Sequence, residues 1–88
     1  MTEKEIVVSN SLGIHARPAS LIVQTATRYR SEVTLEKDGA TADAKSIMSV
    51  MMLAAGKASR VRIRADGPDE QEAVDALAGI FENKFDEE

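Results

Sequence analysis

Hydrophobic residues alternate with polar ones in four short segments, a pattern typical of β-strands. The segments are residues 4–8, 32–37, 40–44 and 60–65. The side chains expected to face inward are Ile6, Val8, Val33, Leu35, Val61, Ile63 and Ala65. Asp38-Gly39, between the second and third segments, is typical of a two-residue hairpin turn because both residues tolerate positive φ. We predict four strands, with the short, alanine-rich third strand at an edge.

The segment after Gly13 spaces its hydrophobic residues as one face of a helix does. The expected buried stripe consists of Ala19, Ile22, Val23 and Ala26. Proline is tolerated only in the first turn of a helix, so Pro18 requires this helix to begin at about Ala16. That start makes His15 the predicted N-cap residue.

Two further helices are predicted. Residues 45–53 form a short one with Ser46 as its N-cap. The last helix follows Asp69, which together with Glu72 resembles a capping box. Its buried stripe is expected to consist of Ala73, Val74, Leu77, Ile80 and Phe81. The element order is therefore β-α-β-β-α-β-α.

This order predicts an α+β fold in which one antiparallel sheet carries its helices on one face. The 88 residues suit a single domain, 1–88, with a small core. Three arginines of the fourth strand alternate with its inward residues and are expected to face solvent on the open side of the sheet.

Composition narrows the function. The chain has no cysteine, which excludes disulfides and thiolate metal sites and favours an intracellular, cytoplasmic location. A formal charge of -4 and only three aromatic residues argue against nucleic-acid binding. No apolar run approaches the roughly 20 residues that span a bilayer, and the first residues are too polar for a signal peptide, so no membrane insertion is expected.

Candidate chemistry gathers at His15, the only histidine. A lone histidine before a helix is commonly a polar cap or a surface residue. Here, however, the helix start offers the N–H groups of Ala16 and Arg17 with a partial positive charge, and the Arg17 guanidinium adds donors for phosphate oxygens. Both disfavour a charged imidazolium, so we expect a neutral, nucleophilic ring. The pattern predicts a phosphoryl acceptor beside an anion site.

Other chemistries have less support. One histidine without cysteine makes no recognisable metal-ligand pattern, so no metal and no cofactor is expected. The serines show no nucleophile elbow, and no glycine-rich nucleotide loop is present. An independent hydrolase would need a second catalytic group, and none is visible.

Two motifs resemble those of a known family. Gly13-Ile14-His15-Ala16-Arg17-Pro18-Ala19 is similar to the active-site signature of the HPr family, the histidine-containing phosphocarriers of the bacterial phosphoenolpyruvate-dependent sugar phosphotransferase system. Lys45-Ser46-Ile47-Met48-Ser49-Val50-Met51 resembles its regulatory serine site. The length, the element order and the entry to the last helix also match, so the resemblance covers essentially the whole chain. It implies an open-faced β-sandwich of four antiparallel strands and three helices.

The resemblance also implies partners. Enzyme I, charged by phosphoenolpyruvate, would pass its phosphoryl group to Nδ1 of His15, and the phosphoprotein would hand it to IIA domains of sugar permeases. Arg17 matches the family's phosphate-stabilising arginine. The chain would then be a carrier intermediate and not a turnover enzyme, with a monomer as the simplest state.

Ser46 has two compatible interpretations. A serine before a short helix is usually a structural N-cap. The resemblance implies that it is also phosphorylated, by an HPr kinase/phosphorylase where one exists, and that the phosphorylated form binds a catabolite-repression regulator in some bacteria. A phosphate at an N-cap meets the helix dipole favourably, so it would add charge without disrupting the fold.

The second helix is apolar most of the way round, and one sheet face cannot bury all of it. Val50 and Leu53 are expected inward, and the others could be core or surface. We favour an exposed patch for partner docking, since Met adapts to several partners. The predicted docking residues are Leu12, Ala16, Ser20, Gln24, Ile47, Met48 and Met51.

One departure from the family and three alternatives remain. The family often has glycine where this chain has Ala54 and Ala58, so Ala58 would be strained if its φ is positive, although we expect no effect at His15.

The nitrogen-branch paralogue shares the chemistry but has other partners. A purely regulatory module acting through Ser46 is a candidate of another class, but such relatives lack the active histidine that this chain has. An independent hydrolase is the most distant alternative.

Overall fold

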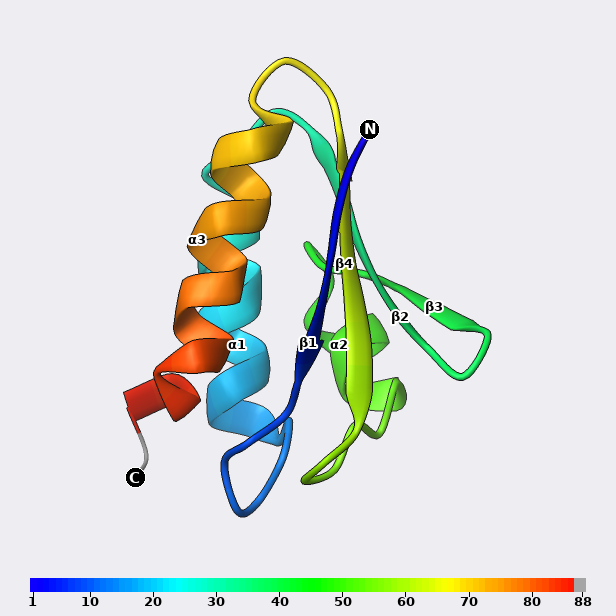
Figure 1. Ribbon diagram of the computed structural model, residues 1–88, viewed down its shortest axis with the longest axis vertical. Helices are drawn as coiled ribbons and strands as arrows, with labels where there is room; N and C mark the ends of the chain where they lie inside the picture. The colour runs from blue at the N-terminus through cyan, green and yellow to red at the C-terminus, as the bar shows by residue number, and fades with distance from the viewer. Residues whose placement is uncertain (87–88) are drawn as a thin grey trace.

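The structure, a computed structural model, describes residues 1–86 and has two layers, a sheet and the helices that cover one of its faces (Figure 1). The strands are β1 (Thr2–Val7), β2 (Glu32–Lys37), β3 (Ala40–Asp43) and β4 (Arg60–Asp66). The helices are α1 (Ala16–Ala26), α2 (Ile47–Met52) and α3 (Glu70–Glu82), followed by the short 3-10 helix η1 (Lys84–Asp86). The predicted element order is confirmed.

The sheet has the strand order β1-β4-β2-β3, and every neighbouring pair is antiparallel. The alternation read from the sequence is confirmed in β4, where Val61, Ile63 and Ala65 are buried and the residues between them are not. β3 lies at an edge, as predicted. β1 begins two residues earlier than predicted and ends at Val7, although Val8 is still buried.

The helical face of the sheet holds the core. α1 begins at Ala16 with His15 as its N-cap, as Pro18 required. Its buried face differs from the predicted stripe in three positions, because Val23 is only partly buried while Pro18 and Thr25 are buried. α3 packs on α1, β1 and β4, so the core joins residues from both ends of the chain. Across residues 1–86, no helix is long and apolar enough to cross a membrane.

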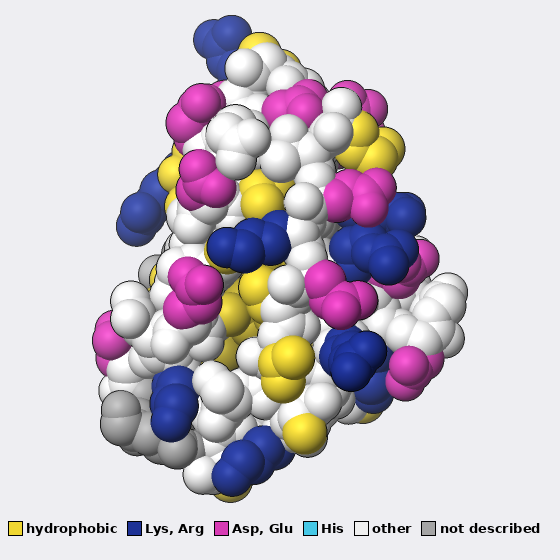
Figure 2. Space-filling model, in the orientation of Figure 1, with side chains coloured by type: hydrophobic (Ala, Val, Ile, Leu, Met, Phe, Trp, Pro, Cys, Tyr) yellow, Lys and Arg dark blue, Asp and Glu magenta, His cyan; other side chains and the backbone are white. Residues whose placement is uncertain are grey.

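The open face of the sheet carries charged side chains in alternating sign (Figure 2). Arg62 lies 3.2 Å from Glu36 and 3.8 Å from Glu3, and Arg64 lies 3.3 Å from Glu3. Arg62 and Arg64 therefore face away from the helices, as predicted, and pair with carboxylates on both neighbouring strands. These side chains are partly exposed, and each pair contributes little stability.

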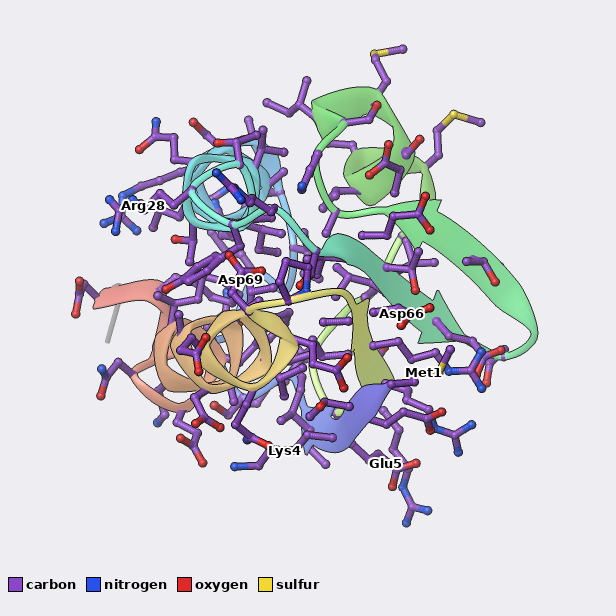
Figure 3. All side chains as sticks on the ribbon, turned by 90° about the horizontal axis from the view of Figure 1, so that it is seen from above. Met1, Lys4, Glu5, Arg28, Asp66 and Asp69 are labelled. Atoms are coloured by element: carbon purple, nitrogen blue, oxygen red, sulfur yellow. The ribbon has the colours of Figure 1, made fainter. Side chains whose placement is uncertain are left out.

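The predicted capping box at the start of α3 is wrong. Asp69 is the N-cap, but its side chain makes no capping hydrogen bond. Its carboxylate instead accepts hydrogen bonds from the N–H groups of Arg30 and Ser31, both 2.9 Å long, and from Ser31 Oγ at 2.6 Å. Asp69 thus lies on the side of α3 that faces α1 (Figure 3) and ties together two loops at one end of the molecule.

These hydrogen bonds predict a specific acid sensitivity. Donation by Ser31 Oγ, and then by the Arg30 N–H, lowers the pKa of Asp69 from 3.8 to about 2. A carboxyl group whose pKa is lowered by folding stabilises the protein above its unfolded pKa and loses that effect as the pH falls through the folded one. We expect Asp69→Asn to lower the free energy of unfolding at neutral pH, and the difference from the unmodified protein to shrink as the pH falls from 3.8 to about 2.

Urea unfolding at several pH values measures this difference. Ser31→Ala removes the largest cause of the lowered pKa and should reproduce the same pH dependence in part. A stability difference that stays constant across that pH range would contradict the assignment.

Candidate functional site

His15 is the N-cap of α1, the helix that begins at the lower end of the molecule in Figure 1. Its backbone is extended, with φ -109° and ψ -164°, and its carbonyl oxygen accepts the first hydrogen bond of the helix from Ala19 N–H at 2.9 Å. Its side chain makes no capping hydrogen bond and is partly exposed. His15 is therefore an N-cap by position, while its ring is not used to cap the helix.

The start of α1 suits an anion. First-turn N–H groups have no acceptor within their own helix and carry a partial positive charge. In α1 these groups belong to Ala16 and Arg17, because Pro18 has none, and the first turn contains no Asp or Glu. No carboxylate of α1 therefore neutralises the positive helix end beside His15.

Arg17 contacts the other end of the described chain. Its Nη1 donates a hydrogen bond to the carbonyl oxygen of Phe85, 68 residues away in sequence. Phe85 is buried and packs edge-on against Phe81, with ring centroids 4.9 Å apart. The turn around Phe85 is left-handed, since Lys84, Phe85 and Asp86 have φ of 53°, 55° and 60°. The guanidinium is thus oriented by a backbone carbonyl that an aromatic contact anchors.

The loop before His15 is closed by Asn10, whose side chain is fully buried. Asn10 Nδ2 donates to the Gly13 carbonyl oxygen at 2.8 Å, and the Gly13 N–H donates to the Asn10 carbonyl oxygen at 3.2 Å. Asn10 is not among the site residues predicted from the sequence. A polar side chain among turn residues gives no sign in the sequence that it is buried.

The turn between α2 and β4 supports the same loop. Ile14 N–H donates to the Ala55 carbonyl oxygen at 2.8 Å, and Ala58 N–H donates to the Val8 carbonyl oxygen at 2.7 Å. Ala54 and Ala58 both have positive φ, 54° and 72°, so the strain anticipated at Ala58 is present. The expectation that this strain has no effect at His15 stays a prediction, although the turn holds the residue directly before His15.

Ser46 is the N-cap of α2, as predicted. Its Oγ accepts a hydrogen bond from the Ser49 N–H at 3.3 Å, and its carbonyl oxygen accepts one from Val50 N–H at 3.0 Å. The hydroxyl group is therefore engaged with the helix while the residue stays partly exposed. Both interpretations of Ser46, cap and modification site, are compatible with this geometry.

The predicted split of α2 is confirmed. Val50 and Leu53 are buried, and Ile47, Met48 and Met51 are exposed. The sequence analysis missed Met52, which is 79% exposed. Sulfur-bearing side chains of α2 project away from the body of the molecule (Figure 3).

The other predicted docking residues lie on and before α1, which packs beside α2. Leu12 is 74% exposed on the loop before His15. Ala16, Ser20 and Gln24 follow at helical spacing, and Gln24 Nε2 donates to Ser20 Oγ at 3.1 Å. Exposed residues of α1 and α2 therefore lie on two neighbouring elements. Their role in docking stays a prediction.

Within residues 1–86, no three side chains of His, Cys, Asp or Glu converge. Two hollows of about 300 Å³ and 230 Å³ are lined by residues of β2, β3, α2 and the segments next to them, and neither includes His15 or Arg17. The site at His15 is an exposed helix start and not one of these hollows.

Comparisons with known proteins agree with this geometry. The sequence profile described as "PTS HPr component phosphorylation site" matches residues 2–83. The chain belongs to the HPr family. "Phosphocarrier protein HPr" of Xylella fastidiosa (strain 9a5c) is 47% identical over 88 residues, which is 100% of this chain and 99% of that protein.

Two further relatives extend the HPr assignment. The crystal structure of HPr-C-His from Thermoanaerobacter tengcongensis superposes with a TM-score of 0.96 at 45% identity and covers 100% of this chain and 99% of that one. "HPr-like protein Crh" of Halalkalibacterium halodurans is 46% identical over 84 residues, 96% of this chain and 100% of that protein. The open four-stranded antiparallel sheet with three helices is thus the fold of HPr structures, and the family is one of phosphocarriers.

The close contact at Gly13 gives a test of how the site is supported. Gly13 has a φ of +68°, and a Cβ atom there would lie 2.6 Å from the Ala55 oxygen and 2.7 Å from the Gly56 Cα. Gly13→Ala should therefore lower the free energy of unfolding by more than about 2 kcal/mol, since backbone strain and overlap add. Thermal or urea unfolding measures it.

Gly39→Ala is the matched control. Gly39 has a φ of +84°, but a Cβ atom there would meet nothing within 4 Å. Only the strain of positive φ, about 1 kcal/mol, is then expected. Equal losses in the two variants would show that the contact with the 54–58 turn does not matter.

Proposed function

We propose that this HPr-family protein accepts a phosphoryl group on His15 from phospho-enzyme I and passes it to IIA domains of sugar permeases. The observation that carries the proposal is the partly exposed His15 ring at the N-terminus of α1, beside Arg17 and with no acidic residue in the first turn. The same constellation serves both halves of the cycle, since it can receive a phosphoryl group and hold it for the next partner.

The proposed step is an in-line displacement. The lone pair of Nδ1 of the neutral imidazole attacks phosphorus, the new N–P bond forms, and the bond from phosphorus to the donor atom of enzyme I breaks with its electron pair leaving on the donor. The phosphoryl oxygens then meet the N–H groups at the helix start. Phosphoryl transfer depends mainly on such positioning and charge stabilisation, so little other machinery is needed on this chain.

Arg17 would stabilise the charge that arrives. Its guanidinium donates to the Phe85 carbonyl oxygen, a neutral acceptor. Charge-assisted hydrogen bonds are stronger than those to neutral acceptors, so a phosphoryl dianion on His15 would compete for the same donors. The carbonyl of Phe85 would hold the side chain near the site before transfer and again after the phosphoryl group has left.

Transfer in both directions requires partners to reach the same ring. The exposed residues of α1 and α2, together with Leu12, form the proposed docking surface. Its apolar members, Leu12, Ile47, Met48 and Met51, suit a patch that several partners cover in turn. A carrier with this arrangement needs no enclosed substrate pocket, because each partner completes the site, and we therefore propose a monomeric phosphocarrier and not a turnover enzyme.

Ser46 is the proposed regulatory position. It begins the helix that presents Ile47, Met48 and Met51, so a phosphate there would place negative charge within the docking surface. The similarity to an HPr-like protein Crh supports such regulation, through an HPr kinase/phosphorylase and a catabolite-repression regulator where the cell has them. The nitrogen-branch paralogue, with the same chemistry, is the alternative for the partner set.

Mass measurement after incubation with phosphoenolpyruvate and enzyme I tests the proposal. We expect one added phosphoryl group that is lost in acid, because phosphoramidates hydrolyse there. The adduct should be absent in His15→Ala and should form more slowly, but still form, in Arg17→Ala. An acid-stable adduct, or one that survives in His15→Ala, would contradict the function.

The role of Ser46 is tested with two substitutions that both keep an N-cap residue but differ in charge. Ser46→Asp and Ser46→Asn both supply good N-cap residues, so the fold should be retained in each. Only Ser46→Asp adds a negative charge, and we expect it to slow transfer from enzyme I by about fivefold or more through weaker association. Rates measured by rapid quench that are equal in the two variants would refute regulation by charge.

A further inference from the structure

We propose that Asn10 is a positioning residue for phosphoryl transfer at His15, acting through the backbone of Gly13 and Ile14. The inference rests on the proposed function and adds to it a residue that cannot touch either partner, because its side chain is fully buried. It is carried by burial, two hydrogen bonds and the backbone conformation that they hold.

Burial of this amide is the first observation. Among the described residues, only Asn10, Thr25 and Ser31 are polar and buried. A buried amide costs free energy unless it is hydrogen-bonded, whereas an apolar side chain at the same place would not. The position therefore has a reason other than core packing for holding an asparagine.

The hydrogen bonds show what that reason is. Asn10 holds both backbone polar groups of Gly13. Its Nδ2 donates to the Gly13 carbonyl oxygen at 2.8 Å, and its carbonyl oxygen accepts from the Gly13 N–H at 3.2 Å. Gly13 has a φ of +68° and packs so closely on the next turn that a Cβ atom there would overlap the backbone of Ala55 and Gly56. Asn10 and the turn of residues 54–58 thus both hold Gly13 in place.

The position of Gly13 determines the position of His15 through the backbone of Ile14. Ile14 follows Gly13 and donates its N–H to the Ala55 carbonyl oxygen at 2.8 Å, which leaves His15 as the next residue and the N-cap of α1. If the Asn10 clamp is lost, Gly13 can leave its left-handed conformation, and the direction in which the chain enters α1 changes. The ring would then be displaced relative to the first-turn N–H groups.

Such a displacement should affect the chemical step more than docking. A misplacement of about 1 Å can cost about 100-fold in rate when reacting groups must be aligned. Six of the seven proposed docking residues lie on α1 and α2, away from Asn10, and only Leu12 lies in the loop that Asn10 closes. The expected signature is a lower kcat for transfer from phospho-enzyme I at an unchanged KM.

The experiment compares two substitutions with a matched control. Asn10→Ala removes the side-chain clamp, and Asn10→Ser is the milder variant that keeps a donor group. Ser31→Ala is the control, because Ser31 is also a buried, hydrogen-bonded polar residue in a loop, but it follows the C-terminal end of α1, whereas His15 precedes the N-terminal end. Rapid-quench kinetics give kcat and KM, and amide hydrogen exchange reports Gly13 and Ile14 directly.

We expect Asn10→Ala to lower kcat by about 10- to 100-fold with KM changed less than about twofold, and Asn10→Ser to fall between it and the unmodified protein. Exchange at the Gly13 and Ile14 amides should accelerate in the Asn10 variants and not in Ser31→Ala. A kcat that is unchanged in both folded Asn10 variants overturns the positioning role, as does a loss of the same size in Ser31→Ala. An unmodified protein that takes up no phosphoryl group overturns the proposed function itself, whatever hydrogen exchange shows of the clamp.

Discussion

The hydrogen bond from the Ile14 N–H to the Ala55 carbonyl oxygen, 2.8 Å long, joins the loop before His15 to the turn that follows α2. The approach at this point is so close that a Cβ atom on Gly13 would overlap the turn. Glycine is therefore required by space as well as by its φ of +68°. Without this junction α1 would still be an amphipathic helix, but the position of its first residue relative to the sheet would not be fixed.

The turn that makes this junction is itself strained. Ala54 and Ala58 adopt positive φ without being glycine, a cost of about 1–2 kcal/mol each. The strain persists because hydrogen bonds join the end of the turn to Val8, which directly follows β1. Ala58 N–H donates to the Val8 carbonyl oxygen at 2.7 Å, and Val8 N–H donates to the Ser59 carbonyl oxygen at 2.9 Å. The same turn continues directly from α2, so the helix that begins at Ser46 and the loop that positions His15 share one support.

Much of this arrangement could be predicted from local sequence. Alternation in residues 60–65 and the proline at position 18 determine nearby backbone conformation, and they correctly gave β4 and the start of α1. The partner of Asp69 could not be predicted, because Ser31 is 38 residues away and competes with the local capping site only in the folded chain. The hydrogen bond of Arg17 to Phe85, which spans 68 residues, was missed for the same reason. Local patterns specify elements, whereas loop-to-loop contacts depend on where packing brings those elements.

The central claim is that His15 carries the phosphoryl group against the start of α1. Nuclear magnetic resonance of the isotope-labelled protein, before and after charging by enzyme I and phosphoenolpyruvate, tests it most directly. We predict phosphorus coupling to one ring nitrogen of His15, accompanied by large shifts of the Ala16 and Arg17 amide signals and small ones elsewhere. Coupling to any other residue, or a phosphorylated His15 whose neighbouring amides do not shift, would contradict the account.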